Sequence, residues 1–152
     1  MTQVDFYILD AESNDSRLRI ACRITEKALQ RRHHVFVNPE SEADARRLDD
    51  LMWTFSQGSF IPHVIVNERL AAPPVEPVLI GIGSPETEDD VTSRLGENWD
   101  LMINLAPEVP SFFSRYARVA EVIDSDPARR EAGRERFRFY RDRGYELKTH
   151  NI

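Results

Sequence analysis

Cysteine is almost absent from this sequence, with Cys22 the single example among 152 residues. One cysteine cannot form an intramolecular disulfide, so the chain has to fold on its hydrophobic core, for which its length is sufficient. No run approaches the ~20 apolar residues that cross a bilayer, and residues 1–10 lack the basic region and apolar stretch of a secretory signal. By elimination we expect a cytoplasmic protein in which Cys22 is a buried helical thiol.

Glycine is missing where a nucleotide-binding loop would require it. The junction between the first predicted strand and the first predicted helix, residues 10–15, has no glycine and contains Asp10, Glu12 and Asp15. Carboxylates at that place would repel a pyrophosphate, which binds to bare backbone N–H groups at a helix N-terminus. The one Gly-x-Gly, at residues 81–83, lacks the third glycine of the dinucleotide motif. The sequence therefore predicts no nucleotide cofactor.

Motifs for metal binding and nucleophilic catalysis are also missing. The histidines are His33, His34, His63 and His150, and none belongs to an H-E-x-x-H motif. A single cysteine excludes the C-x-x-C pairs of zinc sites. No serine lies in a nucleophile-elbow motif. We therefore expect no bound metal and no catalytic residues.

The overall charge restricts the kind of partner. The formal net charge is −6, from 26 acidic and 20 basic residues. A globally acidic protein is repelled by DNA phosphates, so strong direct binding to nucleic acid is not expected. Any anionic partner would have to be met by a local basic patch.

The distribution of apolar residues predicts an α/β fold. Short β-rich or wholly apolar runs predict strands, and amphipathic segments behind helix-capping residues predict helices. Strands alternating with helices indicate an open, mainly parallel sheet covered on both faces, here in one domain spanning residues 1–152. The last strand is expected at a sheet edge, and residues 56–77 are expected to be irregular. The predicted strands are residues 5–9, 35–37, 78–82, 101–105, 119–123 and 145–149, and the predicted helices are residues 18–29, 45–55 and 127–143.

The last predicted helix carries an arginine stripe. This helix and its end hold seven arginines and three acidic residues. At about 100° per residue, Arg130, Arg134, Arg138 and Arg141 form a stripe about 80° wide with Phe137 at its edge. Arginine without lysine favours planar, bidentate recognition of carboxylate or phosphate. The stripe would suit an acidic peptide that also offers an apolar side chain, and a solvated helix face is the alternative.

Large apolar residues crowd the end of the second predicted helix and the segment after it. The core would absorb Leu51, Met52 and Phe55. It is less able to absorb Trp53 and Phe60 as well, because the segments between elements lie on the surface. Exposed aromatic residues of this kind anchor protein interfaces. An interface and additional core packing are both open interpretations of these two residues.

Five segments in order resemble the chi subunit family of bacterial DNA polymerase III. They are residues 5–9, 47–53, 59–63, 121–124 and 134–141, and they span nearly the whole chain. The resemblance implies a three-layer α/β/α Rossmann-like fold without nucleotide chemistry. It also implies a heterodimer with the psi subunit, which connects chi to the clamp loader, and binding of the acidic, phenylalanine-terminated tail of single-stranded DNA-binding protein.

The resemblance also assigns residues to the two partners. On the family pattern, Arg134, Phe137 and Arg138 would form the tail site, to which the stripe adds Arg130 and Arg141. Some relatives have tyrosine and lysine in place of Phe137 and Arg138, so this chain keeps the charge and lacks the hydroxyl. The expected psi interface consists of Trp53, Phe60, Ile61 and Pro62.

The sequence thus predicts a non-catalytic adaptor of the polymerase complex. The alternative is a small nucleotide-binding enzyme on a Rossmann-like fold, which would be stabilised by nucleotide. Direct DNA binding by the arginine helix is a third hypothesis, against which the negative net charge argues.

Overall fold

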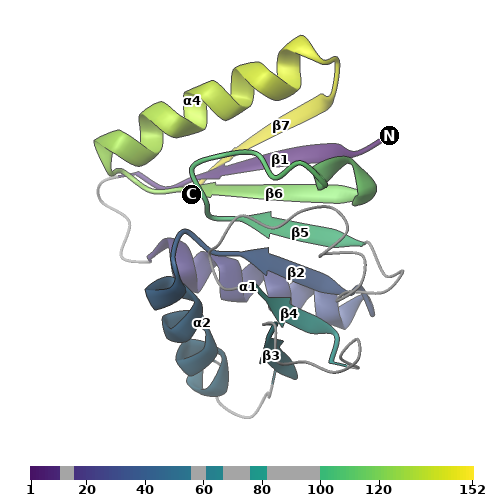
Figure 1. Ribbon diagram of the computed structural model, residues 1–152, viewed down its shortest axis with the longest axis vertical. Helices are drawn as coiled ribbons and strands as arrows, with labels where there is room; N and C mark the ends of the chain where they lie inside the picture. The colour runs from purple at the N-terminus through teal and green to yellow at the C-terminus, as the bar shows by residue number, and fades with distance from the viewer. Residues whose placement is uncertain (11–15, 56–60, 67–75, 82–99) are drawn as a thin grey trace.

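The computed structural model describes residues 1–10, 16–55, 61–66, 76–81 and 100–152 (Figure 1). Within these ranges seven strands form one sheet in the order β3-β4-β2-β5-β6-β1-β7, and every neighbouring pair is parallel. The strands are β1 (Gln3–Ile8), β2 (Val35–Asn38), β3 (His63–Ile65), β4 (Val78–Ile80), β5 (Leu101–Asn104), β6 (Arg118–Ile123) and β7 (Glu146–Asn151), and the helices are α1 (Arg17–Gln30), α2 (Glu42–Thr54) and α4 (Pro127–Asp142), with a short 3-10 helix at Phe113–Arg115.

The predicted α/β architecture is confirmed, with one error. Six predicted strands and three predicted helices appear, and β7 lies at the sheet edge as expected. The prediction of an irregular stretch over residues 56–77 is wrong, because strand β3 lies within it and pairs with β4. Strand β3 begins with His63 directly after Pro62, so no wholly apolar run marks it, whereas the equally short β4 is wholly apolar.

Side chains alternate between the two faces of the sheet and so build two separate cores. Val35 and Val37 of β2 join the cluster under α1 and α2, whereas Phe36 between them joins the cluster that contains Tyr140 of α4. Cys22 is fully buried in the first cluster, and burial raises the pKa of its thiol to about 12. The result is three layers, with α1 and α2 on one face and α4 on the other.

Helix caps fix the start of α1 and α2. The Ser16 hydroxyl accepts a hydrogen bond from Arg19 N at 3.2 Å, and the Ser41 hydroxyl accepts one from Asp44 N at 3.1 Å.

Figure 1 shows α1 and α2 beside β2 and β4, and α4 alongside β7 at the other end of the sheet. No helix in the described residues has the length and apolarity needed to span a membrane.

Candidate functional site

Helix α4 begins and ends where its sequence predicts. The Asp126 side chain accepts a hydrogen bond from Arg129 N at 3.0 Å, and Pro127 occupies the first turn, where a missing N–H costs nothing. Gly144 follows the helix with φ of +80°, a conformation that other residues rarely adopt. These local signals fix where α4 begins and ends without help from distant residues.

A buried carboxylate on β6, that of Glu121, holds the inner face of α4 against the sheet. Arg136 donates to the carboxylate of Glu121 at 2.9 Å, and Tyr140 donates to the same carboxylate at 2.8 Å. Asn104 on β5 donates to it at 3.0 Å, so a carboxylate that is 0% exposed is fully paired. A Cβ added at Gly133 would lie 2.4 Å from the Ile123 side chain, so glycine permits the close approach of helix and strand.

The arginine stripe lies on the opposite, outer face of α4. Arg134 pairs with Glu131 at 2.9 Å, and Arg138 pairs with Glu135; all four side chains are more than half exposed. Arg141 is also exposed and lies 3.2 Å from Asp142. Exposed pairs within one helix contribute little free energy. An incoming carboxylate can therefore replace these partners at small cost.

A hollow opens beside the stripe. It has a volume of about 150 Å³ and is lined by Arg130, Gly133, Arg134 and Phe137 of α4, with Phe6, Ile8 and Ile123 from the strands. The Phe137 ring packs edge-on against Phe6 at 5.2 Å. An apolar cavity of about 150 Å³ admits a benzene-sized ring. The hollow thus offers an apolar floor with two guanidinium groups at its rim.

The structure brings together part of the predicted tail site. Arg130, Arg134 and Phe137 line the hollow, whereas Arg138 and Arg141 are not among its lining residues and lie further along α4. Arg130 also donates to the Leu9 carbonyl at 2.8 Å, which orients its guanidinium. The strand residues of the floor were not predicted from the sequence. Their signal was weak, because they appear in the sequence only as ordinary strand residues.

The aromatic surface near α2 is partly as predicted. Trp53 is 58% exposed, and its ring lies edge-on to the buried His63 at 5.1 Å. Pro62, which precedes His63 in the chain, is half-buried. Ile61 differs from the prediction: it is 2% exposed and packs in the core under α1 and α2, so it supports this surface from beneath. Phe60 lies outside the described residues.

Ion pairs occupy the carboxyl ends of β2 and β6, where ligands bind in many open α/β sheets. Arg129 donates to Glu40 at 2.9 Å and to Asp124 at 3.1 Å, and the buried Arg17 pairs with Asp44. Three carboxylates facing this place would repel a phosphate. The ion-pair network therefore argues against the nucleotide-binding alternative at this crevice.

This ion-pair network should make the free energy of unfolding depend on pH in the acidic range. The hydrogen bond from Arg129 lowers the pKa of Glu40 below its ordinary value, despite partial burial, which acts in the opposite direction. A lowered folded-state pKa gives stabilisation that is present above the unfolded-state pKa and lost as pH falls through the folded-state pKa. We therefore expect the free energy of unfolding, measured with urea, to fall less between pH 7 and pH 3.5 in Glu40→Gln than in the parent. An equal loss in both proteins would contradict this assignment.

Taken with the fold, these surfaces define a Rossmann-like α/β protein with a cationic, aromatic-flanked hollow on its last helix. The family model described as DNA polymerase III chi subunit, HolC, matches residues 1–148. The chain belongs to this family.

Individual relatives agree with this membership. The chain is 39% identical to DNA polymerase III subunit chi of Pseudomonas aeruginosa over 152 residues, which cover 100% of this chain and 98% of the relative. It is 28% identical to the Haemophilus influenzae subunit, covering 97% and 95% of the two chains, and 26% identical to the Escherichia coli subunit, covering 98% and 97%. These relatives are subunits of a replicative polymerase, so this chain is an accessory subunit in DNA replication.

A comparison of solved structures supports the fold alone. The crystal structure of T4 UvsW aligns with a TM-score of 0.64 at 11% identity, covering 99% of this chain and 42% of that one. The similarity shows that this arrangement of parallel strands and helices recurs in an otherwise different protein. It carries no information on the ligand or partner of this chain.

Proposed function

We propose that this chain is a non-catalytic adaptor of the DNA polymerase III holoenzyme, acting in the cytoplasm. In this role it links the clamp loader, through the psi subunit, to the acidic C-terminal tail of single-stranded DNA-binding protein. The observation that carries the proposal is the hollow beside α4, where Arg130, Arg134 and Phe137 surround an apolar floor.

The chemistry of the tail matches this hollow. The tail offers several carboxylates and one terminal phenylalanine ring, as the resemblance to chi implies. The ring would enter the hollow between Phe137 and Ile123, and the terminal carboxylate would pair with Arg134 at the rim. Arg138 and Arg141, further along the helix, would attract the remaining acidic residues. Because these contacts are partly electrostatic, binding should weaken as salt rises.

The arrangement of the two surfaces suits an adaptor. Trp53 lies on α2, next to the β3 and β4 end of the sheet, and α4 lies next to β7 and β1 at the other end (Figure 1). Two partners bound at these places would not compete for the same residues. We infer that psi and the tail are held at the same time, which is the property that a link between two assemblies requires.

A bridging experiment tests the proposed function. Immobilised psi should retain single-stranded DNA-binding protein only when this chain is added. Removal of the terminal phenylalanine from the tail should abolish that retention while psi still captures this chain. Retention without this chain, or retention that is insensitive to the tail, would contradict the adaptor function.

The psi interface has its own prediction. Trp53→Ala combined with Phe60→Ala should abolish co-purification with psi, because truncation of a central aromatic anchor commonly costs 2 kcal/mol or more, about 30-fold in affinity per residue. Thr54→Ala, at the exposed neighbouring position, is the matched control and should leave the complex intact. The measurement is size-exclusion chromatography of the co-expressed pair. An intact heterodimer in the double variant would remove this assignment.

A further inference from the structure

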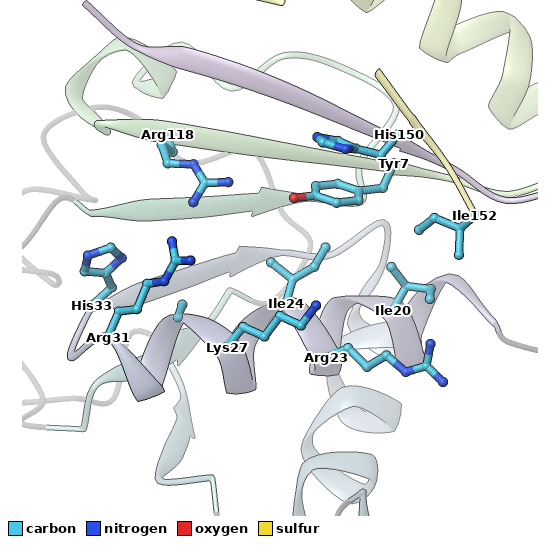
Figure 2. Close-up of a pocket in the computed structure, with 11 residues that line it drawn as sticks. Tyr7, Ile20, Arg23, Ile24, Lys27, Arg31, His33, Arg118, His150 and Ile152 are labelled. Atoms are coloured by element: carbon cyan, nitrogen blue, oxygen red, sulfur yellow. The ribbon is translucent and has the colours of Figure 1, made fainter. Parts of the chain in front are cut away.

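A larger cavity lies on the face of the sheet opposite α4. Its volume is about 390 Å³, and it lies between α1 and strands β1, β6 and β7. Figure 2 shows α1 side chains on one side of it and Tyr7, His150 and Arg118 on the other. Its lining shares no residue with the hollow beside α4 and does not include Trp53, so the proposed function leaves it unused.

The charged side chains that line this cavity are all basic. Arg23 and Lys27 lie four residues apart on α1, and Arg31, the C-cap residue, follows four residues later along the same side, in one row. Arg118 faces them from β6 (Figure 2). Among the described lining residues there is no aspartate or glutamate. Within the described part of the chain, neither Lys27 nor Arg31 forms an ion pair.

A buried carboxylate, that of Asp5, orients the side chains that line the strand side of the cavity. Asp5 is 2% exposed, accepts a hydrogen bond from Arg118 at 2.9 Å and lies 3.2 Å from His150 Nε2. Burial raises the pKa of Asp5, but the hydrogen bonds from Arg118 and His150 outweigh burial and lower it, so the group is a carboxylate at neutral pH. Asp5 therefore balances Arg118 and leaves the charges of Lys27 and Arg31 available to an incoming anion.

The same cavity offers a surface for a planar ring. The Tyr7 and His150 rings are stacked, with centroids 4.7 Å apart and an angle of 16° between their planes. Figure 2 shows the Tyr7 ring between His150 and helix α1, next to Ile24. His150 thus holds one face of the tyrosine, and the apolar side chains of Ile20 and Ile24 line the cavity below it. A purine or pyrimidine could stack against this wall.

We propose that this cavity binds a free nucleotide, with phosphates on Lys27 and Arg31 and the base against Tyr7. Successive cations of the row are about 6 Å apart along the helix axis, a separation that two or three linked phosphates can bridge. The volume falls within the range of about 300–1,000 Å³ of small-molecule sites. An extended peptide or DNA strand would instead need a groove that continues beyond the residues that line this one pocket. The site is distinct from the carboxyl-end crevice, where the network of Glu40 and Arg129 lies.

Isothermal titration of the whole chain tests the nucleotide site. ATP should bind, tripolyphosphate should bind several-fold more weakly because it lacks the base, and adenosine should bind more weakly still. Lys27→Glu combined with Arg31→Glu should reduce ATP affinity at least about tenfold, since two charge-assisted contacts are replaced by repulsion. Both residues are exposed, so the fold should survive, and far-ultraviolet circular dichroism checks this. Arg46→Ala, at an exposed position of α2 that does not line the cavity, is the control and should bind ATP like the parent.

Several results would overturn the proposal. The absence of ATP binding to the folded parent would remove the site. Equal ATP affinity in the double variant would show that the row on α1 does not hold the phosphates. Equal affinity for tripolyphosphate and ATP would show that the base makes no contact with Tyr7 that contributes to binding. Binding of a thymidine oligomer in the absence of ATP binding would identify the surface as a DNA contact instead.

Discussion

Replacing Arg134 with alanine is expected to weaken binding of an acidic, phenylalanine-terminated peptide by about 10- to 100-fold. A hydrogen bond to a charged group is worth about 1.5–3 kcal/mol, which corresponds to this range of affinity. Arg134 is the exposed guanidinium at the rim of the hollow, so its loss should leave the fold intact. Fluorescence anisotropy with a labelled peptide measures the change.

A matched control separates this local contact from general charge effects. Arg46 on α2 forms the same kind of exposed pair, with Glu42 at 2.9 Å, far from the hollow in sequence and topology. Arg46→Ala removes the same charge and should change peptide affinity by less than about twofold at moderate salt. Glu131→Gln should strengthen binding, because it removes the carboxylate that competes for Arg134. Equal losses in Arg134→Ala and Arg46→Ala would show that net charge, not this site, attracts the peptide.

Replacing Glu121 with alanine is expected to cost about 3–5 kcal/mol of unfolding free energy. Arg136 would remain buried without its carboxylate partner, and breaking a buried ion pair from one side costs about this much. Tyr140 and Asn104 would lose the same acceptor. The buried Tyr140 hydroxyl has a strongly raised pKa, caused by burial and then by the Glu121 charge, so it keeps its proton and donates it to the Glu121 carboxylate.

Denaturant unfolding of three variants can measure how much each contact of Glu121 contributes to the free energy of unfolding. Tyr140→Phe removes one hydrogen bond and should cost about 1 kcal/mol. Glu121→Gln keeps the shape and one acceptor, so its cost should lie between those of Tyr140→Phe and Glu121→Ala. Because α4 carries the hollow, the most destabilised variant should also lose peptide binding near its unfolding midpoint. A cost below about 1 kcal/mol for Glu121→Ala would show that the network is not what fastens α4 to the sheet.

Much of the fold could be predicted from local signals. The caps at Ser41 and Asp126 and the stop at Gly144 depend on residues next to each other in the chain, so they are visible in the sequence. Strand β3 was missed because its sequence, His-Val-Ile, is not a wholly apolar run like that of the equally short β4. Ile61 was assigned to the psi interface on the resemblance to the chi family, but it is buried in the core under α1 and α2.

The sites were predictable only where one element supplies them. The arginine stripe lies on α4 alone, so helical periodicity revealed it. Glu121 lies inside an apolar strand, and its partners Arg136 and Tyr140 come from a helix whose packing direction the sequence leaves open. The floor of the hollow, at Ile8 and Ile123, depends on the pairing of β1 with β6, which are far apart in the chain. Such juxtapositions follow from strand order, which no local pattern specifies.

The adaptor account is tested most directly by an anisotropy titration with two labelled peptides, one acidic and ending in phenylalanine and the other lacking that residue. The intact peptide should bind saturably and more weakly as salt rises. The shortened peptide should bind at least about tenfold more weakly, since the hollow would lose a buried ring. Equal affinity for the two peptides, or no binding of either at low salt, would contradict recognition of the tail at this site.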